Sequence, residues 1–157
     1  MEKITSHREF KVYLKAFRAA SEIDQLSNAF PIEETYALVD QIRRSSRPIC
    51  ANIAEAFGRR DYPKSFPNKL KESEAGAAET KNWLDFALDC EYPSENDFSR
   101  LDKAYENIIG MLVNMQKRPE NDLSGLILKT HTPNNRHSTS SAHILNAQCP
   151  VPDIQWQ

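Results

Sequence analysis

The sequence predicts an all-α protein, an up-down-up-down antiparallel four-helix bundle with a disordered C-terminal tail. In four long stretches, apolar residues recur at alternating spacings of three and four, as in helices that bury one face. The 157 residues include only four glycines, and no run of alternating apolar residues stands out as a half-buried strand would. Because the segments between the stretches are short, consecutive helices are expected to be antiparallel neighbours.

The first two predicted helices span residues 8–28 and 31–57. Ser6 and Glu9 have the spacing of a capping box before the first helix. Its apolar stripe comprises Phe10, Tyr13, Leu14, Phe17, Ala20, Ile23 and Leu26. In the second helix, Pro31 is expected as the first residue and Gly58 as the glycine that follows the last turn. Pro48 lies inside this helix, where it removes a backbone hydrogen bond, so we expect a kink or a local break there.

The third and fourth predicted helices span residues 65–89 and 94–118. The third has the seam Phe66, Leu70, Ser73, Ala77, Thr80, Leu84 and Ala87. Its middle, residues 75–78, contains only Ala and Gly, which lets another helix approach closely. Ser94 and Asp97 have the spacing of a helix cap, and Pro119 stops the fourth helix. The fourth seam is the most regular: Phe98, Leu101, Tyr105, Ile108, Leu112 and Met115.

We therefore expect one domain, residues 1–119, followed by a low-complexity tail, residues 120–157, that is rich in Ser, Thr, Asn and Pro. The three cysteines form no Cys-x-x-Cys pair, which favours a reducing compartment. Neither a signal peptide nor an apolar stretch of about 20 residues is present. These observations predict a cytoplasmic protein with no membrane partner.

The residue types do not favour catalysis. A di-iron bundle needs a His three residues after a Glu, and no Glu in the chain has one. Cys50 has no His in the bundle to activate it, and the chain lacks a glycine-rich phosphate loop. We expect no catalytic residue, no metal and no cofactor, and hence a protein that is not an enzyme.

Charge is segregated along the chain, although the net charge is only −2. Residues 41–71 contain eight Lys and Arg against two acids, whereas residues 72–106 contain ten acids against three bases. The candidate nucleic-acid-binding residues are Arg43, Arg44, Arg47, Arg59, Arg60 and Lys64. We expect these cations to form one positive end that either binds phosphates or docks on the acidic face of a neighbouring copy. Few exposed aromatic residues are expected beside the arginines, so base stacking is not predicted.

Asn52 and Glu55 are a polar pair that shares one face of the second helix. If both are buried, each needs a partner, which Arg43, Arg44 or Arg59 would supply. A structural network that fixes helix register or a subunit contact is the favoured interpretation, ahead of a catalytic Glu.

Residues 30–60 resemble the four-helix bundle proteins encoded within intervening sequences of bacterial large-subunit ribosomal RNA genes. The matching positions are Phe30, Pro31, Glu34, Tyr36, Leu38, Gln41, Ile42, Arg43, Arg44, Asn52, Ile53, Ala54 and Glu55. The resemblance continues more weakly through Glu79 and Leu84 and covers roughly residues 8–118. The expected polar network has four members, which are Gln41, Asn52, Glu55 and Glu79. Ala56 stands where the family most often has Gly, and Pro48 lies two residues before the usual proline position.

The resemblance implies a four-helix bundle that assembles into a homopentamer. It also implies kinship with the accessory protein of diversity-generating retroelements, which binds nucleic acid and a reverse transcriptase. We therefore expect a non-enzymatic homo-oligomer that binds RNA or DNA backbones, with a reverse transcriptase as a further expected partner. The alternative is a protein–protein interaction scaffold that binds no nucleic acid.

Overall fold

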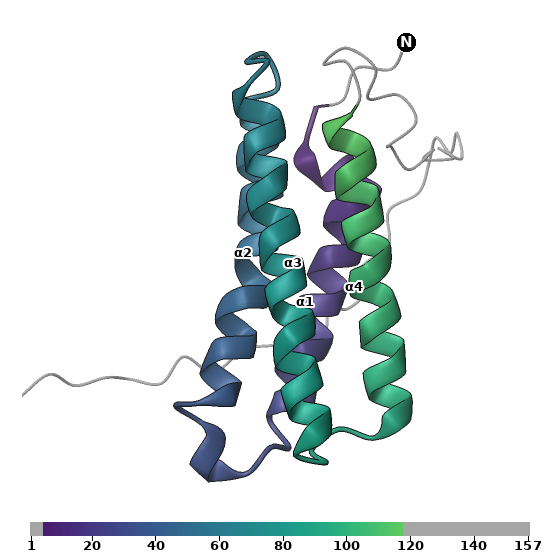
Figure 1. The fold of residues 1–157 in the computed structure, drawn as a ribbon. Coiled ribbons are helices and arrows are strands. Elements are labelled where there is room, and N and C mark those ends of the chain that lie inside the picture. The colour runs from purple at the N-terminus through teal and green to yellow at the C-terminus, as the bar shows by residue number, and fades with distance from the viewer. Residues whose placement is uncertain (1–4, 118–157) are drawn as a thin grey trace, which may run out of the picture.

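The computed structural model describes residues 5–117, which form a bundle of four long helices (Figure 1). The helices are α1 (Lys11–Ser27), α2 (Leu38–Gly58), α3 (Ser65–Asp89) and α4 (Glu95–Gln116). Each helix packs against its neighbours in the chain, and α1 also contacts α4, which closes the ring. The predicted all-α fold is confirmed, whereas the predicted tail, residues 120–157, lies outside the described residues.

Side-chain contacts show that neighbouring helices run in opposite directions, as Figure 1 also shows. Between α2 and α3, Ser73 Oγ donates to the Ile49 carbonyl at 3.1 Å, and Thr80 Oγ1 donates to Ser45 Oγ at 2.9 Å. Residue numbers therefore rise along one helix as they fall along the other. The ion pair between Lys81 Nζ and Asp102 Oδ1, at 3.0 Å, joins α3 to α4.

Two helix caps were predicted, one at Ser6 and one at Ser94, and only the second caps the helix for which it was expected. Ser6 and Glu9 do form one, but it caps a separate 3-10 turn, η1 (His7–Glu9), that precedes α1. At α4 the expected cap is confirmed, because Ser94 Oγ accepts from the Asp97 backbone N–H at 3.1 Å.

The predicted start of the second helix at Pro31 is wrong. A 3-10 turn, η2 (Ile32–Glu34), follows Pro31, and α2 begins only at Leu38. The Glu34 carboxylate explains the difference, since one oxygen accepts from the Leu38 N–H at 3.1 Å and the other from the Tyr92 hydroxyl at 2.9 Å. Glu34 therefore ties the start of α2 to the α3–α4 loop, and its hydrogen bond raises the pKa of Tyr92 to about 12.

Two further predictions for α2 are corrected. Gly58 is the last helical residue and its φ is not positive, so it does not act as a left-handed cap. Of the kink or local break expected at Pro48, the break does not occur, because the α-helix continues through this residue, which lies on the exposed side. Its missing N–H would have pointed to the Arg44 carbonyl one turn back, where solvent can take its place.

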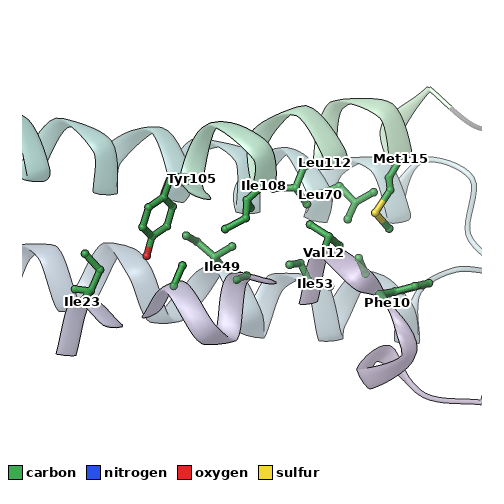
Figure 2. Packing of buried hydrophobic residues seen from close by; sticks show 14 of the residues in the cluster. Phe10, Val12, Ile23, Ile49, Ile53, Leu70, Tyr105, Ile108, Leu112 and Met115 are labelled. Atoms are coloured by element: carbon green, nitrogen blue, oxygen red, sulfur yellow. The ribbon is translucent and has the colours of Figure 1, made fainter. Parts of the chain in front are cut away.

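All four helices contribute to the core (Figure 2). The largest fully buried side chains are Phe10, Ile23, Ile42, Ile49, Ile53, Leu70, Leu84, Leu101, Tyr105, Ile108, Leu112 and Met115. Most of them belong to the predicted seams. A second, smaller cluster of Phe30, Leu38, Val39 and Ala87 lies at the end of the bundle that holds the α1–α2 loop.

A close contact between α2 and α3 depends on Gly76 of α3. A Cβ added there would lie 3.3 Å from both Ile49 Cγ1 and the Ser45 carbonyl oxygen of α2. Of the small residues predicted for the middle of the third helix, Gly76 faces α2 and Ala77 is buried, whereas Ala75 and Ala78 are exposed. The close approach at Gly76 lets the Ser45–Thr80 hydrogen bond form.

Gly76→Val is expected to destabilise the protein by about 1–3 kcal/mol, because the added methyl groups would force α2 and α3 apart. The matched control is Gly110→Val, since nothing lies within 4 Å of a Cβ at Gly110. That control is expected to be neutral or slightly stabilising. Chemical denaturation measures both, and equal effects at the two sites would contradict the close approach.

Tyr105 is a buried exception, because its hydroxyl has no hydrogen-bond partner of good geometry among the described residues, although the Ser46 side chain lies near it. Burial raises the pKa of Tyr105. We expect Tyr105→Phe to stabilise the protein by about 1 kcal/mol, since it removes a desolvated hydroxyl. Tyr92→Phe is the control and is expected to destabilise the protein, because it deletes the hydrogen bond to Glu34. If Tyr105→Phe destabilises the protein more than Tyr92→Phe does, the Tyr105 hydroxyl makes a hydrogen bond in the folded protein and this prediction is wrong.

Candidate nucleic-acid interface

The six predicted cations lie in two groups on α2 and the turn that follows it. Arg43, Arg44 and Arg47 lie in the first half of α2, and Arg59, Arg60 and Lys64 lie at the α2–α3 turn. Arg44 and Arg59 are fifteen residues apart, which is about 22 Å along a helix. The six residues therefore do not form the single positive end that the sequence analysis expected.

Arg43 is a structural residue that joins α1 to α2. Its Nε donates to Ser27 Oγ at 2.8 Å, and its Nη2 donates to the Asp24 carbonyl at 3.2 Å and to Asn28 Oδ1 at 2.8 Å. The Asp24 carboxylate lies 3.5 Å from the same guanidinium. Since these contacts occupy most of its donors, Arg43 is poorly placed to meet a phosphate.

Arg44 and Arg47 are more exposed, but each lies beside a carboxylate of the same chain. Arg47 Nη2 lies 2.8 Å from Asp24 Oδ1, and Arg44 Nη1 lies 3.5 Å from Asp40 Oδ2. The Arg44 side chain is 75% exposed, so the Asp40 contact constrains it little. Arg44 is therefore the member of this group best able to reach a ligand.

The second group lies on the α2–α3 turn, with fewer carboxylate contacts. Arg59 is 3.7 Å from Glu55. Arg60 donates to the Phe57 carbonyl at 2.9 Å and stacks on the Phe57 ring at 4.4 Å, while Lys64 is exposed. Within residues 5–117 no carboxylate lies within 4 Å of Arg60 or Lys64. These side chains remain available for an anion.

Tyr62 lies among these cations and is 64% exposed. Few exposed aromatic residues were expected beside the arginines, and Tyr62 is one of them. Its position in the turn, between Arg60 and Lys64, provides a flat surface on which an unpaired base can stack.

Within residues 5–117, no side-chain hydrogen bond or ion pair joins the four residues of the predicted polar network to one another. Glu55 lies 3.0 Å from Lys69 Nζ, and the Lys69 hydrogen bond is the main reason that the pKa of Glu55 is lowered. Glu79 accepts from Trp83 Nε1 at 3.3 Å. No side-chain hydrogen bond joins Gln41 or Asn52 to the rest of the described chain. The buried hydroxyls between α2 and α3, described above, join these two helices, and a role of the four residues in a subunit contact stays a prediction.

The fold collects the charges at opposite ends of the bundle. The half that contains the α2–α3 turn, here called the basic end (5–18, 49–76 and 106–117), has ten Lys and Arg against six Asp and Glu. The other half, the acidic end (19–48 and 77–105), has six against twelve. Formal net charges of +4 and −6 follow for the two halves.

This division separates the two predicted groups. The first arginines of α2 lie at the acidic end, which explains why they meet carboxylates, and the cations of the turn lie at the basic end. The basic end also includes four cations of η1 and α1 that the sequence analysis missed. They are Arg8, Lys11, Lys15 and Arg18, and their helical spacing was the signal that could have found them.

Among residues 5–117, no group of three or more His, Cys, Asp and Glu side chains is arranged to hold a metal ion. Cys50 is half-buried, and burial raises the pKa of its thiol to about 11, so the protonated form dominates near neutral pH. None of the helices in this part of the chain is long and apolar enough to cross a membrane.

Comparisons with known proteins agree with the bundle. A family model described as 23S rRNA-intervening sequence protein matches residues 8–114. A solved chain from Bacteroides thetaiotaomicron, described as a protein with unknown function from the S23 ribosomal protein family, is 28% identical. The match covers 68% of this chain and 99% of that chain, with a TM-score of 0.62. None of the curated proteins is similar to this chain.

The structural role of Arg43 is testable by comparison with Arg44. We expect Arg43→Met to destabilise the protein by about 2 kcal/mol, because the buried Ser27 hydroxyl and the end of α1 lose a charged donor. Arg44→Met keeps the same stem length and is expected to leave stability unchanged, since Arg44 makes one weak exposed contact. Urea denaturation measures both, and equal losses would contradict this assignment.

Proposed function

Because the chain belongs to the 23S rRNA-intervening sequence protein family, we propose that it is a non-enzymatic accessory protein that binds the sugar-phosphate backbone of RNA or DNA. The names of the family and of its solved relative refer to ribosomal RNA and to a ribosomal protein family, and the relative is described as having unknown function. The proposal is therefore carried by the electrostatics of this chain.

The observation that carries it is the cationic α2–α3 turn. Arg59, Arg60 and Lys64 lie close together there, on an end of the bundle with a formal net charge of +4. A polyanion is drawn to this end and repelled by the acidic one, so the field orients the bundle as it approaches. Contacts of this kind recognise phosphates and are sensitive to salt.

Tyr62 adds a preference to the proposal. A base can stack on its exposed ring only where it is unpaired, so a single strand or a loop gains a contact that a regular duplex cannot make. We therefore expect single-stranded RNA to bind more tightly than duplex RNA of the same length.

A protein–protein scaffold is the second candidate, and two observations favour it. Ile32, Tyr36 and Phe86 are large apolar side chains that are more than half exposed near the α1–α2 loop. The opposite charges of the two ends also allow the acidic end of one copy to meet the basic end of the next. Two further proposals fit both candidates. One is that the chain forms a homo-oligomer, such as a pentamer, and the other is that it binds a reverse transcriptase.

The test measures binding of the full chain to a labelled 20-nucleotide single-stranded RNA by fluorescence anisotropy between 50 and 200 mM KCl. The triple variant Arg59→Gln, Arg60→Gln and Lys64→Gln is expected to reduce the slope of log affinity against log salt by about 2. The control variant Ala78→Glu, Asn82→Glu and Asn96→Glu makes the same change in net charge at exposed positions of the acidic end. It is expected to preserve the slope.

Light scattering of the same samples separates the two candidates. If the wild-type chain binds no RNA and the triple variant loses its oligomeric state, the arginines serve subunit contacts and the scaffold is the better account.

A further inference from the structure

A second cationic surface lies between α1 and α4, away from the α2–α3 turn. Lys15 and Arg18 of α1 and Lys103 of α4 surround a groove of about 270 Å³. Ala19 and Ala104 also line the groove, and Asn107 adds a polar edge. The two helices adjoin in the ring described above (Figure 1).

The cations of this groove have no acidic partners in the described chain. No carboxylate of residues 5–117 lies within 4 Å of Lys15, Arg18 or Lys103. The one acid at the groove, Glu22, pairs with Arg100. The arginines of α2, by contrast, meet Asp24 and Asp40, so this groove is the less neutralised surface.

The cations also continue in one direction. Lys11, Lys15 and Arg18 are spaced by four and three residues on α1, so they form a stripe along one face, and Arg8 precedes them in η1. From Lys11 to Arg18 the stripe rises about 10 Å along α1. It starts at the basic end of the bundle and leads into the groove, which lies at the boundary between the two ends and takes Lys103 from the acidic one.

We propose that the α1–α4 groove binds the phosphodiester backbone of a single nucleic-acid strand, as a second contact surface beside the α2–α3 turn. The inference rests on the proposed function, because it assumes that nucleic acid is the ligand. Packed helix axes lie about 8–10 Å apart, so the groove between two of them accepts one strand and not a whole duplex. The Lys and Arg side chains neutralise successive phosphates, and the Asn107 amide donates to a phosphate or sugar oxygen.

The neutral variant Lys15→Gln, Arg18→Gln and Lys103→Gln tests the groove with a 20-nucleotide poly(U) RNA, which has little structure of its own. We expect the slope of log affinity against log salt to fall by about 2, and affinity at 0.1 M salt to fall on the order of 100-fold. The thermal midpoint is expected to stay unchanged, because these residues make no ion pair within the described chain. The acidic-end variant Ala78→Glu, Asn82→Glu and Asn96→Glu is the matched control for net charge.

The outcomes distinguish this inference from the proposed function. If poly(U) binds and only the α2–α3 turn variant weakens it, the groove proposal is wrong and the function stands. If the wild-type chain binds neither RNA nor DNA, both fail. Equally tight binding of poly-L-glutamate, with the same loss in the groove variant, would show that the groove takes any polyanion and would overturn the assignment to phosphodiesters.

Discussion

The contact between α2 and α3 fixes the register on which the rest of the structure depends. Gly76 lets the two helices approach until the Thr80 hydroxyl reaches Ser45 and the Ser73 hydroxyl reaches the Ile49 carbonyl. A shift of one turn would break both bonds between the helices. Ser45 and Thr80 would keep bonds to the Ile42 and Gly76 carbonyls of their own helices, whereas the buried Ser73 hydroxyl would lose its partner, at about 1–3 kcal/mol. The aliphatic seam alone tolerates such shifts far better, because one apolar contact replaces another.

The register decides where the charges meet. The second half of α3 and the first half of α4 are acidic, and the antiparallel arrangement places both at the same end of the bundle. The first half of α2 lies at that end too, so Arg43, Arg44 and Arg47 lie beside carboxylates. The cations of α1 and of the α2–α3 turn share the opposite end. Although the net charge of the protein is small, the two ends of the bundle therefore carry opposite charges.

Local patterns in the sequence were sufficient to predict the four helices, most of the core and the Ser94 cap, because each depends on neighbours within one or two turns. The start of α2 could not be predicted in this way, since Glu34 finds Tyr92 fifty-eight residues away. The structural role of Arg43 could not be predicted either, because its partners Asp24 and Ser27 belong to another helix. Counting charges in windows of the sequence also hid the stripe on α1, which only the helical spacing reveals.

The central claim is that a polyanion meets this bundle at its basic end. Ultraviolet cross-linking of the full chain to single-stranded RNA, followed by mass spectrometry of the cross-linked peptides, tests it most directly. Cross-links are expected in the peptide that contains Tyr62 and in the peptides of α1, and none between Glu79 and Asp102. Cross-links concentrated in that acidic segment, or RNA that leaves every peptide unmodified at saturating concentration, would contradict the account.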